Sequence, residues 1–186
     1  MSSPRIDPLP PPYDAELQAS FDVVMPAGVA PLNIFRTVGR NPRVLSRMVR
    51  GGLLDRGSIS LFERELVILR ACYRCGGEYE WGVHAAIFAA KAGLSDVQLR
   101  DSCSDTPDDA LWREKDRLLL SMVDSLHARS DIDEGLWRAL SSHYDDAQLV
   151  ELVMLAGLYH AVSFVVNAFR VEAESFAPAF PQVTGT

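Results

Sequence analysis

One stretch constrains the fold more than any other: Leu152 to Phe169 contains no Asp, Glu, Lys or Arg over 18 residues. Its length lies at the lower edge of what spans a bilayer. The stretch also contains His160, Ser163 and Asn167, and polar side chains of this kind are rare in helices that face lipid. We therefore expect a helix that is buried in protein, in the core or in a subunit contact, and no membrane insertion.

Helix-starting signals recur along the rest of the chain. Asn41 with Pro42 is typical of a helix start, and Ser60, Ser95 and Asp131 are each followed three residues later by Glu or Gln. No sustained alternation of apolar and polar residues predicts a strand. The fold class expected is all-α. Helices are predicted at about residues 13–24, 60–73, 111–128 and 146–174. Further helices are expected to start at residues 42, 95 and 131, and one that carries His84 is expected to end at Gly93.

The chain of 186 residues is long enough for one domain with a substantial core. Five prolines between Pro4 and Pro12 predict an extended N-terminal arm over residues 1–12. The polar segment Ser102 to Asp109 is short, so we expect it to join two halves of a single helical domain over 13–176, followed by a tail over 177–186.

Composition excludes several classes of function. A net charge of −7 with scattered arginines lacks the basic face that a nucleic-acid binder needs. Three cysteines do not suggest a secreted disulfide framework, and the N-terminus has no apolar secretion signal, so a cytoplasmic location is expected.

Glu65 is the first candidate for chemistry. Its helix neighbours three and four residues away are all apolar, namely Leu61, Phe62, Ile68 and Leu69. Glu63 and Arg70, seven residues apart, are interpreted instead as a solvated face of the same helix. A buried carboxylate either pairs with an arginine from another helix or has a pKa above its usual value, and both alternatives remain open for Glu65.

Glu80 and His84 are the second candidate, because residues four apart share a helix face. The helix from Trp81 to Ala90 is otherwise apolar, which predicts a buried imidazole. A carboxylate one turn away can fix the tautomer of His84 and support its protonated form, as a proton relay requires. The alternative is a core histidine that Glu80 merely satisfies.

The stretch Arg64 to Arg70, then Glu78-Tyr79-Glu80-Trp81 with His84, then Ala92 to Ser95, resembles the carboxymuconolactone decarboxylase family, which includes the AhpD-like alkylhydroperoxidases. The resemblance implies an AhpD-like helical bundle that forms homo-oligomers (dimer, trimer or hexamer). It also implies a site between helices near subunit contacts.

The family's redox motif, Cys-x-x-Cys-x-x-x-His, is not conserved here. Counting back from His84, its cysteine positions fall on Gly77 and Glu80, while the associated glutamate falls on Glu65. The chain is in this respect similar to the decarboxylase branch. A displaced Cys-x-x-Cys, Cys72 with Cys75, is rotated by about 140° on a helix of 3.6 residues per turn, so a redox role would need these thiols to act away from His84.

Together these features predict a decarboxylase-like enzyme, a lyase, that moves protons on a small carboxylated or carbonyl-bearing substrate. Glu65, Glu80 and His84 are the candidate catalytic residues, and Tyr79, Trp81 and Asn167 the candidate substrate-binding residues. His160, Ser163 and Asn167 form a polar stripe that can line the same pocket, whereas His127 and His143 are interpreted as solvated and Cys103 as inert. No metal and no cofactor are expected.

Two other classes stay open. A thiol peroxidase would use Cys72 and Cys75, and a non-catalytic oligomeric binding protein would keep an apolar pocket but tolerate the loss of Glu80 and His84. The expected partners are a small-molecule substrate and further copies of the chain, without nucleic acid or membrane.

Overall fold

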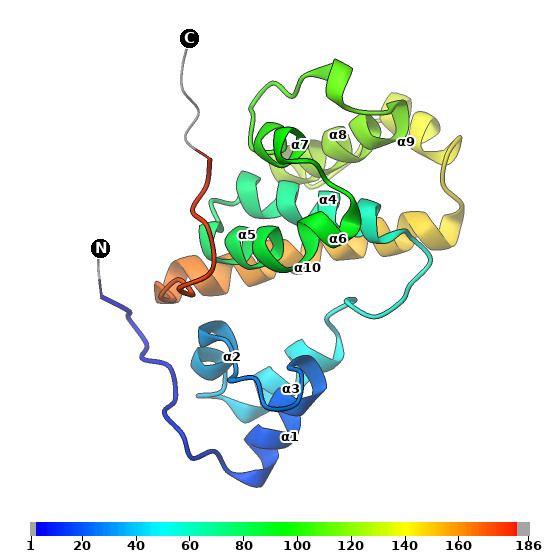
Figure 1. Ribbon diagram of the computed structural model, residues 1–186. Coiled ribbons are helices and arrows are strands. Elements are labelled where there is room, and N and C mark those ends of the chain that lie inside the picture. The colour runs from blue at the N-terminus through cyan, green and yellow to red at the C-terminus, as the bar shows by residue number, and fades with distance from the viewer. Residues whose placement is uncertain (1–2, 182–186) are drawn as a thin grey trace.

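The computed structural model describes residues 3–181, and no strand occurs among them. The prediction of an all-α fold is confirmed (Figure 1). The helical elements are α1 (Ala15–Val24), α2 (Asn33–Val38), α3 (Pro42–Arg50), α4 (Leu61–Arg74), α5 (Glu78–His84), the π-helical turn η1 (Ala85–Ala89), α6 (Ala90–Ala92), α7 (Asp96–Asp101), the 3₁₀ turn η2 (Asp109–Leu111), α8 (Glu114–Arg129), α9 (Glu134–Ser141) and α10 (Asp146–Phe169).

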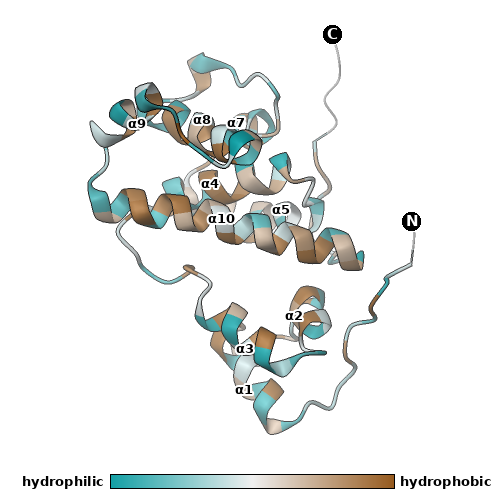
Figure 2. Ribbon diagram, turned by 180° about the vertical axis from the view of Figure 1, so that it is seen from behind, coloured by the Kyte–Doolittle hydropathy of each residue, from teal (hydrophilic) through white to brown (hydrophobic). Residues whose placement is uncertain are grey.

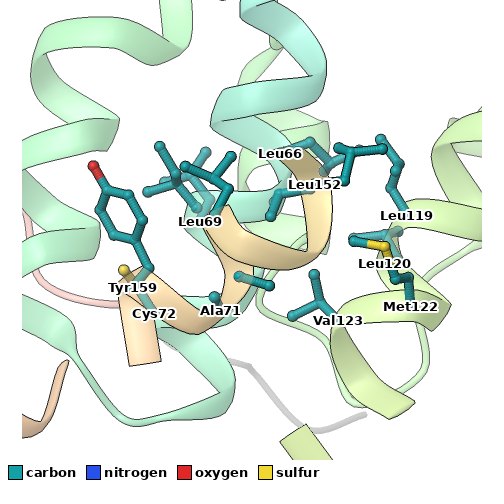
Figure 3. Close-up of a cluster of buried hydrophobic side chains, with 14 of the residues drawn as sticks. Leu66, Leu69, Ala71, Cys72, Leu119, Leu120, Met122, Val123, Leu152 and Tyr159 are labelled. Carbon is teal, nitrogen blue, oxygen red and sulfur yellow. The ribbon is translucent and has the colours of Figure 1, made fainter. Parts of the chain in front are cut away.

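Helix α4 lies at the centre of the main core and packs against α5, α8 and α10. It starts at a capping box in which Ser60 and Glu63 bond reciprocally to each other's backbone. Leu66 to Leu69 are all fully buried, and Figure 3 shows Leu66 and Leu69 in one cluster with Leu119, Met122 and Leu152. A helix buried on nearly every side must also bury polar positions, and α4 does.

Those buried polar positions correct one expectation. Glu63 and Arg70, predicted to lie on a solvated face, are both buried. Arg70 donates to both carboxylate oxygens of Asp124, at 2.7 and 2.6 Å, and the Lys115 ammonium lies 2.7 Å from Glu63. Because α8 covers this side of α4, each of these buried charges pairs with a half-buried partner from α8.

Helix α10 separates the main core from a second one. One face of α10 packs on α4 and α5, and Val162 and Val166 also contact the small cluster formed by α1, α2 and α3. Figure 1 shows these three helices on the opposite side of α10 from α7, α8 and α9. By length and composition α10 could cross a membrane. Within the fold this helix is buried only in part, so the burial that the sequence predicted for the stretch is confirmed only in part.

Several boundaries differ from the prediction. Helix α10 ends at Phe169 rather than near 174, because Arg170 adopts a left-handed conformation with φ of 52°. Helix α9 is capped by Asp133 and not by Asp131. The π-helical turn directly after His84 has no counterpart in the prediction. Of the proposed arm and tail, residues 1–2 and 182–186 lie outside the described part.

The chain after α10 returns along α5. Phe180 packs against Tyr73 and Trp81 with ring centroids 5.7 and 5.4 Å apart, and its backbone N–H donates to Glu78. The carbonyl of Pro178 lies so close to Gly82 that a Cβ there would sit 2.4 Å from it. The segment therefore packs tightly against the helix that carries His84.

Candidate active site

His84 and Glu65 form a buried pair. His84 ends α5 and is 2% exposed, while Glu65 projects from the first half of α4 and is fully buried. The imidazole Nδ1 lies 2.6 Å from Glu65 Oε2. The other carboxylate oxygen, Oε1, accepts from Arg64 at 2.9 Å, so the counter-charge comes from the adjacent residue of the same helix and not from another helix. Glu65 therefore fixes the orientation of the ring.

The second ring nitrogen of His84 faces Tyr159 and Glu80. Nε2 lies 3.0 Å from the hydroxyl of Tyr159, on α10, and 3.4 Å from Glu80 Oε1. The Tyr159 ring meets the imidazole edge to face, with centroids 5.1 Å apart. The structure thus brings together all three predicted catalytic residues and adds Tyr159, which the sequence analysis did not select.

The arrangement sets the charge of the histidine. Burial by itself lowers the pKa of His84, but hydrogen bonds to Glu65 and Glu80 and the charges of both carboxylates outweigh it and raise the pKa to about 9. His84 is therefore an imidazolium at neutral pH, and both ring nitrogens donate. Burial, reinforced by the charge of Glu80, raises the pKa of Tyr159 well above its usual value, so Tyr159 remains a neutral phenol.

A cavity of about 690 Å³ adjoins these groups. Glu80, Phe88, Tyr159 and Val162 line one side of it, so two of the polar groups around His84 face the cavity. Apolar residues of the small α1–α3 cluster and of the loop after α3 line the other side. Its size and mostly apolar lining suit a small organic molecule. Arg50 supplies a positive charge among the lining residues, and Asp55 a negative one.

The residues predicted to bind substrate do not line this cavity. The Tyr79 hydroxyl donates to Glu174 at 2.7 Å and accepts from the backbone of Ile34, which ties α2 and the C-terminal segment to α5. Trp81 is 2% exposed and packs into the core. Asn167 donates to the carbonyl of Cys75, at the far end of α4. For Asn167 the helix period explains this position, since α10 turns Tyr159 and Val162 toward the cavity instead.

The polar stripe of α10 likewise lies elsewhere. His160, Ser163 and Asn167 face the turn between α4 and α5: the His160 ring meets the His127 ring edge to face, and Ser163 contacts Gly77. A Cβ at Gly77 would lie 2.5 Å from the Ser163 hydroxyl, so this position has no room for a cysteine while Ser163 keeps its place. Gly77 is the position that corresponds to the first cysteine of the redox motif.

Within residues 3–181, none of the three cysteines forms a disulfide. Cys72 is fully buried near Tyr159 (Figure 3), and burial together with the charge of Glu80 raises its pKa well above the usual value. Burial also raises the pKa of Cys75, and it raises that of Cys103 to about 12. None of them is a thiolate at neutral pH, which is the form that attacks peroxides.

No family model and no curated protein matches the sequence. Solved structures resemble the fold. An uncharacterised peroxidase-related protein from Silicibacter sp. TM1040 has a TM-score of 0.76 over 96% of both chains, at 18% identity. A protein of unknown function from Agrobacterium tumefaciens, described in connection with the antioxidant defence protein AhpD, has a TM-score of 0.59 over 75% of this chain and 90% of its own, at 19% identity.

The debrominase Bmp8, as a cysteine-to-alanine variant in complex with 2,3,4-tribromopyrrole, has a TM-score of 0.74 over 92% of both chains, at 15% identity. Structural similarity at this level of sequence identity shows a shared fold and not a shared chemistry. The chain therefore has the AhpD-like helical fold that the sequence predicted.

Proposed function

We propose that the chain is an enzyme that transfers protons to and from a small carboxylated or carbonyl-bearing organic molecule held in the cavity. One observation carries the proposal: the buried imidazole of His84 lies between Glu65 on one side and two groups that face the cavity, Tyr159 and Glu80, on the other. In such a relay Glu65 orients the ring and His84 carries the proton. Tyr159 and Glu80 can then exchange protons with the bound molecule.

Tyr159 suits the role of an acid toward a carbonyl oxygen. Because His84 Nε2 donates to the Tyr159 oxygen, the hydroxyl hydrogen is free to donate into the cavity. As negative charge develops on a substrate oxygen, that hydrogen bond strengthens, and the imidazolium behind it stabilises the developing phenolate character.

Glu80 suits the role of the group that gives a proton to a carbon atom of the substrate or takes one from it. In a decarboxylation, the C–C bond to the carboxylate breaks, CO2 leaves, the electron pair of that bond moves into an enolate, and carbon then takes up a proton. His84 Nε2 carries one proton, so the ring gives up its hydrogen bond to Tyr159 when it passes that proton to Glu80 across 3.4 Å, and Glu80 can then deliver it to carbon. Isomerisation uses the same groups, with Glu80 first removing a proton from carbon. Arg50 is suitably charged to attract a substrate carboxylate, which the overall charge of −7 does not.

The test is a screen of unsaturated lactone acids, keto acids and 2,3,4-tribromopyrrole for binding and turnover by the parent chain and by His84→Ala. We expect turnover of a carbonyl-bearing acid that falls by about 10² to 10⁴ in His84→Ala. Tyr79→Phe is the matched control, because it removes a buried hydroxyl of α5 that does not line the cavity. Equal turnover by His84→Ala would refute the relay, and binding that is unchanged without any turnover would favour the non-catalytic class.

The peroxidase alternative makes a separate demand. It needs Cys72 or Cys75 to become a thiolate, and the raised pKa of both thiols does not favour this. A titratable thiol count that is unchanged after mild peroxide treatment would exclude that class.

Self-association belongs to the same proposal. Val150, Met154 and Phe164 are 65%, 61% and 65% exposed, and with Gly157 and Ala161 they follow a four-three spacing along the outer face of α10. Figure 2 shows hydrophobic residues along the length of this helix. A spacing of this kind suits packing against an equivalent helix of another copy. Light scattering should find an oligomer that Phe164→Glu dissociates and Val97→Glu, an exposed apolar position on α7, does not.

A further inference from the structure

Three potential metal ligands meet outside the cavity. Cys75 caps the C-terminus of α4, His127 lies in the last turn of α8, and His160 lies on α10. Their ligand atoms all lie within 4.8 Å of one another. From the sequence, His127 was interpreted as solvated and no metal was expected. The three residues are 52 and 33 positions apart along the chain, so no short spacing connects them.

One distance in this cluster matches a tetrahedral zinc site, and the third ligand lies close by. Zinc bonds thiolate sulfur at about 2.3 Å and imidazole nitrogen at about 2.0 to 2.1 Å, so in a tetrahedral site these two ligand atoms are about 3.5 to 3.6 Å apart. Cys75 Sγ and His127 Nδ1 are 3.6 Å apart. The His127 and His160 rings have centroids 5.2 Å apart, so the second imidazole approaches the same point.

His160 is available as a ligand. Its side chain is half-buried beside the ring of His127. Among residues 3–181, His160 makes no hydrogen bond to another protein group. Asn167 donates to the Cys75 carbonyl at 2.9 Å and so fixes the turn that carries the sulfur. In known metal sites, hydrogen bonds from neighbouring residues orient the ligands in a similar way.

We propose that Cys75, His127 and His160 form a binding site for a borderline-soft divalent cation, with Zn²⁺ as the best fit. One sulfur and two nitrogens are the donors that this class of ion prefers. Three protein ligands leave the fourth tetrahedral position to water, as in zinc sites that remain open. Binding replaces the thiol proton of Cys75 by the metal and releases that proton to solvent, so affinity rises with pH.

The test is a titration of the full, metal-free chain with Zn²⁺ in competition with a chromophoric chelator. We expect one Zn²⁺ per chain, and affinity that falls by about 100-fold or more in each of Cys75→Ser, His127→Ala and His160→Ala. His143→Ala is the matched control, an exposed histidine outside the cluster, and should bind as the parent does. Circular dichroism of each variant checks that the helices remain.

A second measurement identifies the sulfur ligand directly. Co²⁺ in the same site should give a thiolate-to-metal charge-transfer band in the near ultraviolet, and this band should be absent in Cys75→Ser. A chain that takes up no Zn²⁺ at micromolar concentration, or whose affinity is the same in the three variants and in His143→Ala, would overturn the proposal.

Discussion

Replacing Glu65 by Gln tests the electrostatics of the candidate site. The substitution keeps the shape of the side chain and an oxygen that can accept from His84 Nδ1, but it removes the negative charge 2.6 Å from the imidazole. Arg64 keeps its hydrogen bond to the carbonyl of Leu54. The substitution therefore removes the ion pair with His84 and the one with Arg64, and the pair with His84 is the one that sets the charge of the imidazole.

The size of the effect follows from the pKa. The folded protein raises the pKa of His84 from 6.5 to about 9, and each unit corresponds to about 1.4 kcal/mol, so the carboxylates favour the imidazolium by about 3 kcal/mol in excess of the burial penalty. Glu80 remains in the variant, but at 3.4 Å it is the more distant partner. In Glu65→Gln the side chain beside His84 is neutral, and His84 is only 2% exposed. Burial therefore outweighs the remaining charge of Glu80, and we expect the pKa of His84 to fall below 6.5.

NMR titration of the His84 ring measures this directly. A parent pKa near 9 implies stability that is fully present below pH 6.5 and is lost as the pH rises through 9, because the folded state binds the proton more tightly than the unfolded chain. Glu65→Gln should abolish that loss between pH 6.5 and 9. A variant in which His84 still titrates near 9 would refute the assignment of Glu65 as the group that holds the charge.

Three further outcomes are expected. Tyr159→Phe should lower turnover by about 10² with a nearly unchanged KM, because it removes only the outer donor of the relay; an unchanged rate would exclude Tyr159 as the acid. Glu63→Gln should cost about 3 kcal/mol of unfolding free energy at pH 7 in urea titrations, since pairing with Lys115 and Ser60 lowers the pKa of Glu63 from 4.5 to about 2 against the effect of burial. In the parent that contribution is present above pH 4.5 and is lost as the pH falls toward 2, so equal acid sensitivity of variant and parent would contradict it. Gly77→Cys should lower Tm, and Ser163→Gly should restore it; a Gly77→Cys chain as stable as the parent would show that Ser163 moves freely.

The helical fold could be predicted from local signals. The caps at Ser60 and Ser95 and the left-handed Gly93 act within a few residues, so their effect is visible in the sequence. Gly93 has φ of 84° and ends the helical run that carries His84, as predicted. The end of α10 was missed because Arg170 adopts a left-handed conformation that sequence statistics seldom assign to arginine.

The candidate site could be predicted only in part. The burial of Glu65 followed from its apolar helix neighbours, and the structure confirms it. Tyr159 was missed because its contact with His84 spans 75 residues and depends on how α10 packs on α5. Glu63 and Arg70 were misjudged for a related reason: periodicity within α4 cannot reveal that α8 supplies Lys115 and Asp124 on that side.

Deuterium exchange into a bound ligand tests the central claim most directly. The parent chain is incubated in heavy water with the tightest-binding carbonyl acid, and the ligand's carbon-bound protons are followed by NMR. Exchange that is fast in the parent, about 10² slower or more in His84→Ala, and unchanged in Tyr79→Phe is the result we expect. Exchange at the same rate with and without the His84 imidazole would show that the buried ring does not carry the proton.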